Sequence, residues 1–410
     1  MMIPNDKTKK MTFLKNQLSI DLLIIIAIVA IFTIFYFLNS NHLWNLVTKQ
    51  QDIIFGSDTK DTLFHLNHPS FEDDARKHLL LFVTLGPITK FMQFVLHVSS
   101  TRSIRLLLSM IAAINIGGIY YFLKKYSGST INALSFAGVY AMTFSTMVIY
   151  SIPETYSSSN LFILIYLAIL FSVRKKITYR NTILLSLIAA FASLYNPVLL
   201  SLIVIHLLML FLQNGKIFWV KAAVSNIFLA FSIYFLSNFV IYGMDFITFV
   251  DGYSSRYASL TNFLNHEKVL SVLSDFYYFS ILSPHSCLTA RLGLSDWHSY
   301  IHFPLKLCFI ILLTIFMIYT IYTIFKKNNE NRTFLVAILV WMVILTMFYI
   351  YFNPNEAMLY SSQVLFPMVI LFSQSFERIK IKSMYKYLLL GILFSFMAYT
   401  NILTYYNGMG

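Results

Sequence analysis

Charged side chains are scarce in this chain. Only 11% of the 410 residues are Asp, Glu, Lys or Arg, whereas a soluble domain carries about 25%. The hydrophobic fraction is 58% and the mean hydropathy is +0.70. One buried core cannot hold so much apolar surface over this length, which excludes an ordinary soluble domain and predicts a polytopic membrane protein.

Cysteine and the common cofactor motifs are also scarce or missing. The two cysteines, Cys287 and Cys308, give no disulfide framework. The sequence contains no P-loop, GxGxxG, HExxH or GxSxG pattern, so no motif supports ATP-driven transport or zinc proteolysis. Residues 243–303 include several His and Asp residues, but no pair of them has the spacing of metal ligands on a predicted helix.

Long apolar runs make up most of the chain. They are continuous, as in "LLIIIAIVAIFTIFYFL" (22–38), rather than alternating, which predicts helices and not barrel strands. The basic N-terminus precedes a long run without a small-residue cleavage site, which favours an uncleaved first span over a signal peptide. The fold class is therefore an all-α polytopic membrane protein. The eleven predicted spans are 18–38, 104–123, 130–150, 157–173, 181–197, 198–213, 217–242, 304–325, 333–352, 361–377 and 386–404.

Basic clusters decide the predicted topology. The N-terminus and "RKKITYR" (174–180) are typical of cytoplasmic segments. Both can be cytoplasmic only if the apolar segment 79–98 does not cross. We therefore predict an interfacial helix there, bent at Gly86-Pro87. The N-terminus is then cytoplasmic and the C-terminus outside, within one integral membrane domain, 1–410. Its long outer loops are 39–103 and 243–303.

The net charge of +13 fits this topology better than nucleic-acid binding. Nineteen of the 30 basic residues fall in the short predicted cytoplasmic segments, and most of the 17 acidic residues fall outside. The outer face is therefore predicted to hold nearly all groups capable of acid–base work.

Two aspartates stand out in the first outer loop. Asp58 and Asp61 are three residues apart in "GSDTKD", so on a helix they would share a face. A carboxylate at the membrane boundary can be desolvated and held ionised by a cation, as a general base requires. An ordinary solvated polar loop is the alternative.

Cations follow in the same loop and open the next span. Lys77 and His78 end "EDDARKH", and Arg105 lies in "STRSIRLLLS". Helix capping, lipid contact and snorkelling account for such residues. A clamp for a phosphate is the functional alternative.

Two polar hairpins complete the set. Glu154 follows Pro153 in "YSIPETYSSSN", where it could line a cavity or cap the next helix. Glu356 and Tyr360 lie in "FNPNEAMLYSSQ", a composition that sugar sites share with ordinary loops.

The order of these elements resembles the GT-C superfamily of membrane glycosyltransferases, which use sugars linked to polyprenyl phosphate. It is similar to the bacterial branch near the protein O-mannosyltransferases and the O-antigen-modifying enzymes. The resemblance covers about 18–200, with weaker support from "NPNEAMLYSS". It rests on an early Asp in the first loop, the Lys-His start of an apolar helix, an Arg opening the second helix and a third helix ending in Pro-Glu. "KHLLLF" lacks the two prolines of the family's HPPL-like element.

The resemblance implies a GT-C-type bundle in a bacterial inner membrane and an inverting transfer of sugar from undecaprenyl phosphate to a hydroxyl of a lipid-linked or surface glycan. It implies Asp58, or Asp61, as the catalytic carboxylate. Lys77, His78 and Arg105 would contact the donor phosphate, and Glu154, Glu356 and Tyr360 the substrates. No cofactor is required by the residues, and a divalent cation stays an open alternative. The rival functions are an O-antigen polymerase, which would depend on Arg256 and Arg291, and a polysaccharide flippase.

Overall fold

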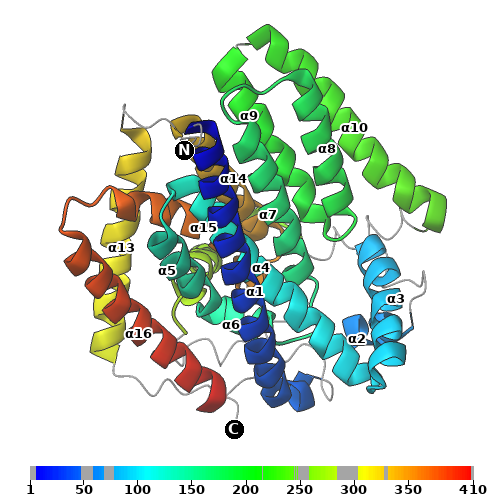
Figure 1. Ribbon diagram of the computed structural model, residues 1–410. Helices are drawn as coiled ribbons and strands as arrows, with labels where there is room; N and C mark the ends of the chain where they lie inside the picture. Colours follow the sequence, from blue (N-terminus) through cyan, green and yellow to red (C-terminus); the bar gives the residue numbers. More distant parts are fainter. Residues whose placement is uncertain are drawn as a thin grey trace.

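The computed structural model describes residues 6–47, 59–68, 78–214, 216–243, 245, 247, 258–283, 303–326 and 331–407. Within these ranges the chain forms helices and no strand (Figure 1). The helices are α1 (Asp6–Val47), α2 (Thr59–Asn67), α3 (Leu79–Leu96), α4 (Ser100–Ser127), α5 (Thr130–Ala141), α6 (Phe144–Ile149), α7 (Tyr156–Val173), α8 (Tyr179–Ser193), η2 (Pro197–Leu202), α9 (Ile203–Asn214), α10 (Lys216–Tyr242), η3 (Leu260–Phe263), α12 (His266–Ser274), η4 (Asp275–Phe279), α13 (Phe303–Phe325), α14 (Arg332–Phe352), η6 (Pro354–Glu356), α15 (Ala357–Glu377) and α16 (Ser383–Asn407).

Nine helices of the described ranges are long and apolar enough to cross a bilayer. The protein is therefore all-helical over the described ranges and membrane-embedded, as the composition predicted. The number of helices that actually cross stays a prediction. The nine candidate spans are Ser19–Trp44, Leu79–Leu96, Ser100–Ser127, Tyr156–Val173, Trp219–Tyr242, Leu305–Phe325, Arg332–Phe352, Pro354–Glu377 and Ser383–Tyr406.

The long helices connect two ends of the bundle. At one end, here named the C-terminal face, α1 and α16 end and α4 begins (Figure 1). There the Tyr405 hydroxyl donates to the Asn39 carbonyl oxygen at 2.8 Å. At the opposite N-terminal face α7 ends and α14 begins, and Arg174 Nε donates to Asn331 Oδ1 at 2.8 Å. Basic residues at the ends of α4, α7, α13 and α15 gather at the N-terminal face, which the sequence predicts to be cytoplasmic.

The predicted span 130–150 is broken in two. Helix α5 ends at Ala141 and α6 begins at Phe144, with backbone groups released between them. The amides of Phe144 and Ser145 donate to the carbonyl oxygens of Ile281 and Ser280 at 3.2 and 2.9 Å. Inside a membrane such groups must find protein partners, and segment 280–283 supplies them.

Asn401 on α16 also bonds to backbone groups at the break between α5 and α6. Its Nδ2 donates to the carbonyl oxygens of Met142 and Ile281 at 2.8 and 2.7 Å, and its Oδ1 accepts from the Ser283 amide at 2.8 Å. One side chain therefore joins α16 to the α5–α6 break and to segment 280–283.

Three other segments differ in detail from the sequence expectations. The predicted spans 181–197 and 198–213 form α8, which ends at Ser193, and the pair η2–α9, which Asn196-Pro197 starts; neither is among the nine candidate spans. Helix α3 continues through Pro87 and is long enough to span. In Figure 1 it lies beside α2 and the start of α4, in the half of the bundle nearer the C-terminal face.

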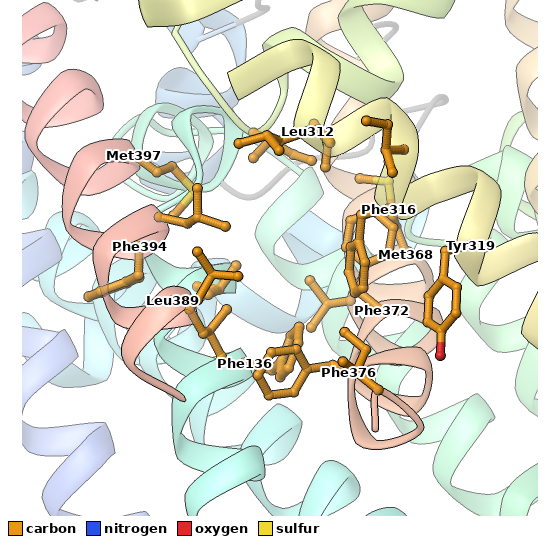
Figure 2. A pocket seen from close by; sticks show the side chains of 18 of the residues that line it. Phe136, Leu312, Phe316, Tyr319, Met368, Phe372, Phe376, Leu389, Phe394 and Met397 are labelled. Atoms are coloured by element: carbon orange, nitrogen blue, oxygen red, sulfur yellow. The ribbon is translucent and has the colours of Figure 1, made fainter. Parts of the chain in front are cut away.

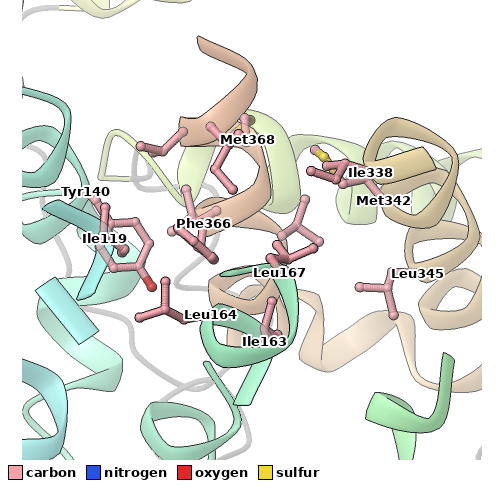
Figure 3. Close-up of a cluster of buried hydrophobic side chains, with 14 of the residues drawn as sticks. Ile119, Tyr140, Ile163, Leu164, Leu167, Ile338, Met342, Leu345, Phe366 and Met368 are labelled. Carbon is pink, nitrogen blue, oxygen red and sulfur yellow. The ribbon is translucent and has the colours of Figure 1, made fainter. Parts of the chain in front are cut away.

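The core surrounds α15, in which every residue from Ala357 to Phe376 is buried. Helices α4, α5, α7, α13 and α14 and η4 pack against it, and Figure 3 shows part of the apolar contact with α4, α5, α7 and α14. Helices α4 and α7 approach closely at Gly118, which has no Cβ atom. A Cβ atom there would lie 2.3 Å from Leu164 Cδ2. The labelled core residues are Ile119, Tyr140, Ile163, Leu164, Leu167, Ile338, Met342, Leu345, Phe366 and Met368.

A buried polar network joins α7 to α8, α9 and α10. Tyr166 and His206 Nδ1 lie 2.7 Å apart, and His206 Nε2 lies 3.3 Å from Ser186 Oγ. Ser186 also donates to Asn226 Oδ1 at 3.0 Å, and Asn226 Nδ2 donates to Thr182 Oγ1 at 3.1 Å. Because its members satisfy one another, the network serves as a link between helices rather than as a reactive site.

Asn226→Leu is expected to lower the free energy of unfolding by about 1 kcal/mol, since each interhelical hydrogen bond in a bilayer contributes on that order. The unfolding midpoint of the detergent-solubilised protein measures the effect. Val224→Leu, at an exposed position of the same helix, is the control and should leave the midpoint unchanged. Equal midpoints for Asn226→Leu and the wild type would show that the network does not hold α10.

Candidate functional site

Two residues of the predicted site, Asp58 and Lys77, lie outside the described residues. The residues on which a polymerase would depend, Arg256 and Arg291, also lie outside them. Their roles stay predictions. The neighbouring Asp61 and His78 are described, and so are Arg105, Glu154, Glu356 and Tyr360.

A small apolar cluster gathers the parts of the first outer loop. Leu66 of α2, Leu81 and Leu85 of α3, and the start of α4 pack together with Trp44 of α1. The cluster fixes the helices that carry Asp61, His78 and Arg105 at the C-terminal face. Asp61 lies half-buried in the first turn of α2, where its charge favours the helix dipole.

His78 begins α3 and ties it to the end of α8. Its Nδ1 lies 2.7 Å from the carbonyl oxygen of Tyr195. The Leu80 amide donates to the Leu194 carbonyl oxygen at 3.0 Å, and Thr84 Oγ1 lies 2.6 Å from the Tyr195 hydroxyl. These contacts place His78 at the junction of α3 and α8, with one ring nitrogen occupied by the backbone.

Arg105 is buried and holds α4 against α1. Its Nε donates to Ser40 Oγ at 2.8 Å and its Nη2 to the Phe37 carbonyl oxygen at 2.9 Å. The guanidinium also lies 4.6 Å from the Phe37 ring centroid and 5.8 Å from that of Trp44. These bonds use two of the five N–H donors of an arginine. The sequence offered snorkelling or phosphate contact, and the interhelical bonds to α1 were not foreseen.

Glu154 lies in a stretch in which every residue from Ser151 to Asn160 is buried. Its Oε2 accepts from the Thr155 amide at 3.1 Å, directly before α7 begins. The N-cap of α7 is Thr155, whose side chain makes no capping bond, so the contact of Glu154 is with the N-cap amide and not with the first turn of the helix. The other alternative, that Glu154 lines a cavity, stays a prediction.

Several hydroxyl and amide atoms near the starts of α7 and α15 are buried without a hydrogen-bond partner among the described residues. Such atoms are costly inside a membrane protein. They mark a region that is chemically suited to a polar ligand rich in hydroxyls. We name the set the hydroxyl cluster; its atoms are Thr155 Oγ1, Ser157 Oγ, Ser158 Oγ, Asn160 Oδ1, Ser362 Oγ and Gln363 Nε2.

The structure brings Glu356 and Tyr360 together beside the start of α7. The Tyr360 hydroxyl donates to Glu356 Oε2. The Tyr360 ring stacks on Tyr349 at 4.0 Å between centroids and meets Tyr156 edge-on at 5.8 Å. Tyr156 lies two residues after Glu154, so these predicted substrate residues occupy neighbouring positions at the C-terminal face.

Sequence reasoning missed two buried ionisable residues. Asp275 is 3% exposed and lies in η4, which packs against α15. Lys306 is 4% exposed near the start of α13, and its Nζ donates to the Ser283 carbonyl oxygen at 3.0 Å. A lysine inside the apolar run "FPLKLCF" is a signal that could have marked Lys306. The burial of Asp275 has no such local signal.

Tyr405 lies between the two halves of the site. Besides donating to Asn39, its hydroxyl lies in reach of Ser151 and of the charge of Arg105. It therefore connects the α1–α4 part, which carries Arg105, with the stretch that carries Glu154.

No three His, Cys, Asp or Glu side chains of the described ranges group in a way that would hold a metal ion. The search of protein-family models found no match, and no curated protein matches the chain at a significant level.

Proposed function

We propose that the protein is a membrane glycosyltransferase that moves a sugar from polyprenyl phosphate to a hydroxyl of a glycan or lipid-linked acceptor. The observation that carries the proposal is the hydroxyl cluster, with its adjoining Tyr156, Tyr349 and Tyr360, buried at one end of a hydrophobic bundle. Aromatic rings and hydroxyl or amide groups together are suited to a sugar, which presents both apolar faces and hydroxyls.

The placement of the charged residues supports the same reading. Asp61, Arg105 and Glu356 belong to helices that meet at the C-terminal face, and Glu154 lies two residues before α7. In the proposal this face is the outer side of a bacterial inner membrane. A donor whose lipid tail lies in the bilayer presents its sugar phosphate at that depth, beside these residues.

In the proposed reaction the acceptor oxygen bonds to the anomeric carbon as the bond from that carbon to the phosphate oxygen breaks. The electron pair leaves with the phosphate, and the acceptor proton passes to the carboxylate of Asp58, or of Asp61. Arg105, Lys77 and His78 stabilise the charge that develops on the leaving phosphate. Attack from the face opposite the phosphate inverts the anomeric carbon.

A transfer assay tests the proposal against its rivals. Membranes containing the protein are supplied with a labelled monosaccharide on polyprenyl phosphate and with lipid-linked glycan acceptors. Addition of single sugars supports the proposal. Joining of preassembled oligosaccharide units without single-sugar transfer indicates a polymerase, and movement of labelled lipid across vesicles without transfer indicates a flippase.

Tyr360→Phe is expected to raise the KM for the acceptor by about tenfold, since a hydrogen bond to a charged group contributes about 1.5 kcal/mol or more. The substitution removes the hydroxyl that orients Glu356 and keeps the ring that stacks on Tyr349. Steady-state transfer rates at varied acceptor concentration measure the KM. Tyr351→Phe, on a tyrosine exposed near the same face, serves as the control. If the two variants have the same KM, Tyr360 does not contribute to acceptor binding.

A further inference from the structure

An apolar groove runs along α13, α15 and α16. Figure 2 shows Leu312, Phe316 and Tyr319 of α13 on one side and Leu389, Phe394 and Met397 of α16 on the other. Side chains of α15 and Phe136 of α5 form its floor. The cavity measures about 670 Å³, a volume typical of ligand sites. We name it the α13–α16 groove.

The groove is long and can be reached from the bilayer. It extends from Phe309 to Lys326 along α13, which at 1.5 Å per residue is about 25 Å, close to the thickness of a hydrocarbon core. Its two walls, α13 and α16, are peripheral helices, because only 22% of the residues in the most apolar stretch of each are buried. A hydrocarbon chain can therefore enter sideways.

Three cations close the end of the groove at the N-terminal face. Lys326 and Lys380 are exposed, and Arg378 is partly buried. Arg378 is held in place, since its Nη1 donates to the Thr323 carbonyl oxygen at 3.1 Å. With the Gln374 amide turned so that its oxygen faces the guanidinium, Arg378 Nε and Nη2 donate to that oxygen at 2.7 and 2.9 Å. These bonds occupy three of the five N–H donors of an arginine and leave two for a ligand.

Acidic groups do not cancel this charge within the groove. None of the described residues that line it is Asp or Glu. Glu377, which directly precedes Arg378 in the chain, accepts from Asn132 Nδ2 of α5 at 2.9 Å. Lys386 donates to the carbonyl oxygens of Phe376 and Glu377 at 3.1 and 3.4 Å and so is occupied elsewhere. The end of the groove therefore carries a net positive charge.

We propose that the α13–α16 groove binds an anionic phospholipid, with an acyl chain along the apolar walls and the phosphate at Lys326, Arg378 and Lys380. Bidentate arginine and mobile lysine ammonium groups are the side chains that recognise phosphate. A zwitterionic lipid would bring its own cation to the same place and bind less well. This site lies at the opposite face from the proposed transfer site and does not rest on the glycosyltransferase proposal.

The test is native mass spectrometry of the full chain in detergent, titrated with phosphatidylglycerol or phosphatidylcholine of identical acyl chains. The wild type should bind phosphatidylglycerol at least tenfold more tightly. A lysine near an anionic lipid surface contributes about fivefold in affinity, so K326Q combined with K380Q should lose roughly 25-fold. Both lysines are exposed, so the fold should tolerate the changes.

The control makes the same change of charge elsewhere on the same face. K175Q combined with K176Q alters two exposed lysines after α7, and it should leave lipid affinity unchanged. Leu393→Trp narrows the groove and should weaken both lipids. Equal affinity for the two lipids, equal losses in the two lysine double variants, or displacement by millimolar inorganic phosphate would each overturn the proposal.

Discussion

Asp58→Asn is expected to lower the rate of sugar transfer between about a hundredfold and ten-thousandfold, the range that a general base contributes. Asparagine keeps the size and polarity of the side chain but cannot accept the proton of the acceptor hydroxyl. The measurement is transfer of labelled sugar from polyprenyl phosphate in membranes with matched amounts of each variant. Donor binding, measured separately, should change little, because the proton moves only during the reaction.

The neighbouring carboxylate supplies the matched control. Asp61 lies in the first turn of α2, so Asp61→Asn removes one charge three residues away. If Asp58 is the base, Asp61→Asn should reduce transfer far less than Asp58→Asn. The reverse order would assign the base to Asp61, and full activity in both variants would reject a carboxylate base in this loop.

Arg105→Gln is expected to reduce kcat by about a hundredfold or more, in the range seen when one donor to a developing negative charge is removed. The same change also breaks the bonds to Ser40 and Phe37, so loss of stability would lower activity as well. A second variant is needed to separate the two effects.

Ser40→Ala provides that separation. It removes the acceptor of the Arg105 Nε bond and leaves the cation in place. Its unfolding midpoint should fall, though by less than that of Arg105→Gln, which also loses the bond to Phe37, while kcat in the folded fraction stays near the wild-type value. If kcat falls equally in both variants, Arg105 serves only to hold α4 against α1.

The membrane class and most long helices follow from local sequence because burial of apolar surface depends on composition over about 20 residues. The runs that form α1, α4, α7 and α13 through α16 are of this kind. The break between α5 and α6 is different. The sequence "YAMTFST" contains no Gly or Pro, and its backbone partners come from Ile281 and Asn401, far along the chain.

In the candidate site too, some contacts follow from local sequence and others depend on residues far along the chain. The pairing of Glu356 with Tyr360 is a local i,i+4 relation that spacing makes predictable. The partner of Arg105 is 65 residues away on another helix, and the burial of Asp275 depends on how η4 packs against α15. Spacing alone could therefore name Arg105 as a phosphate ligand or a snorkelling cation but could not find its contact with α1.

The three bonds of Asn401 give the chain an order of assembly. The groups that this side chain joins, at Met142, Ile281 and Ser283, are translated and inserted before α16 leaves the ribosome. Until α16 is in place, the Met142 carbonyl oxygen in the gap between α5 and α6 lacks this partner, so the full set of bonds at the break requires the last of the described helices.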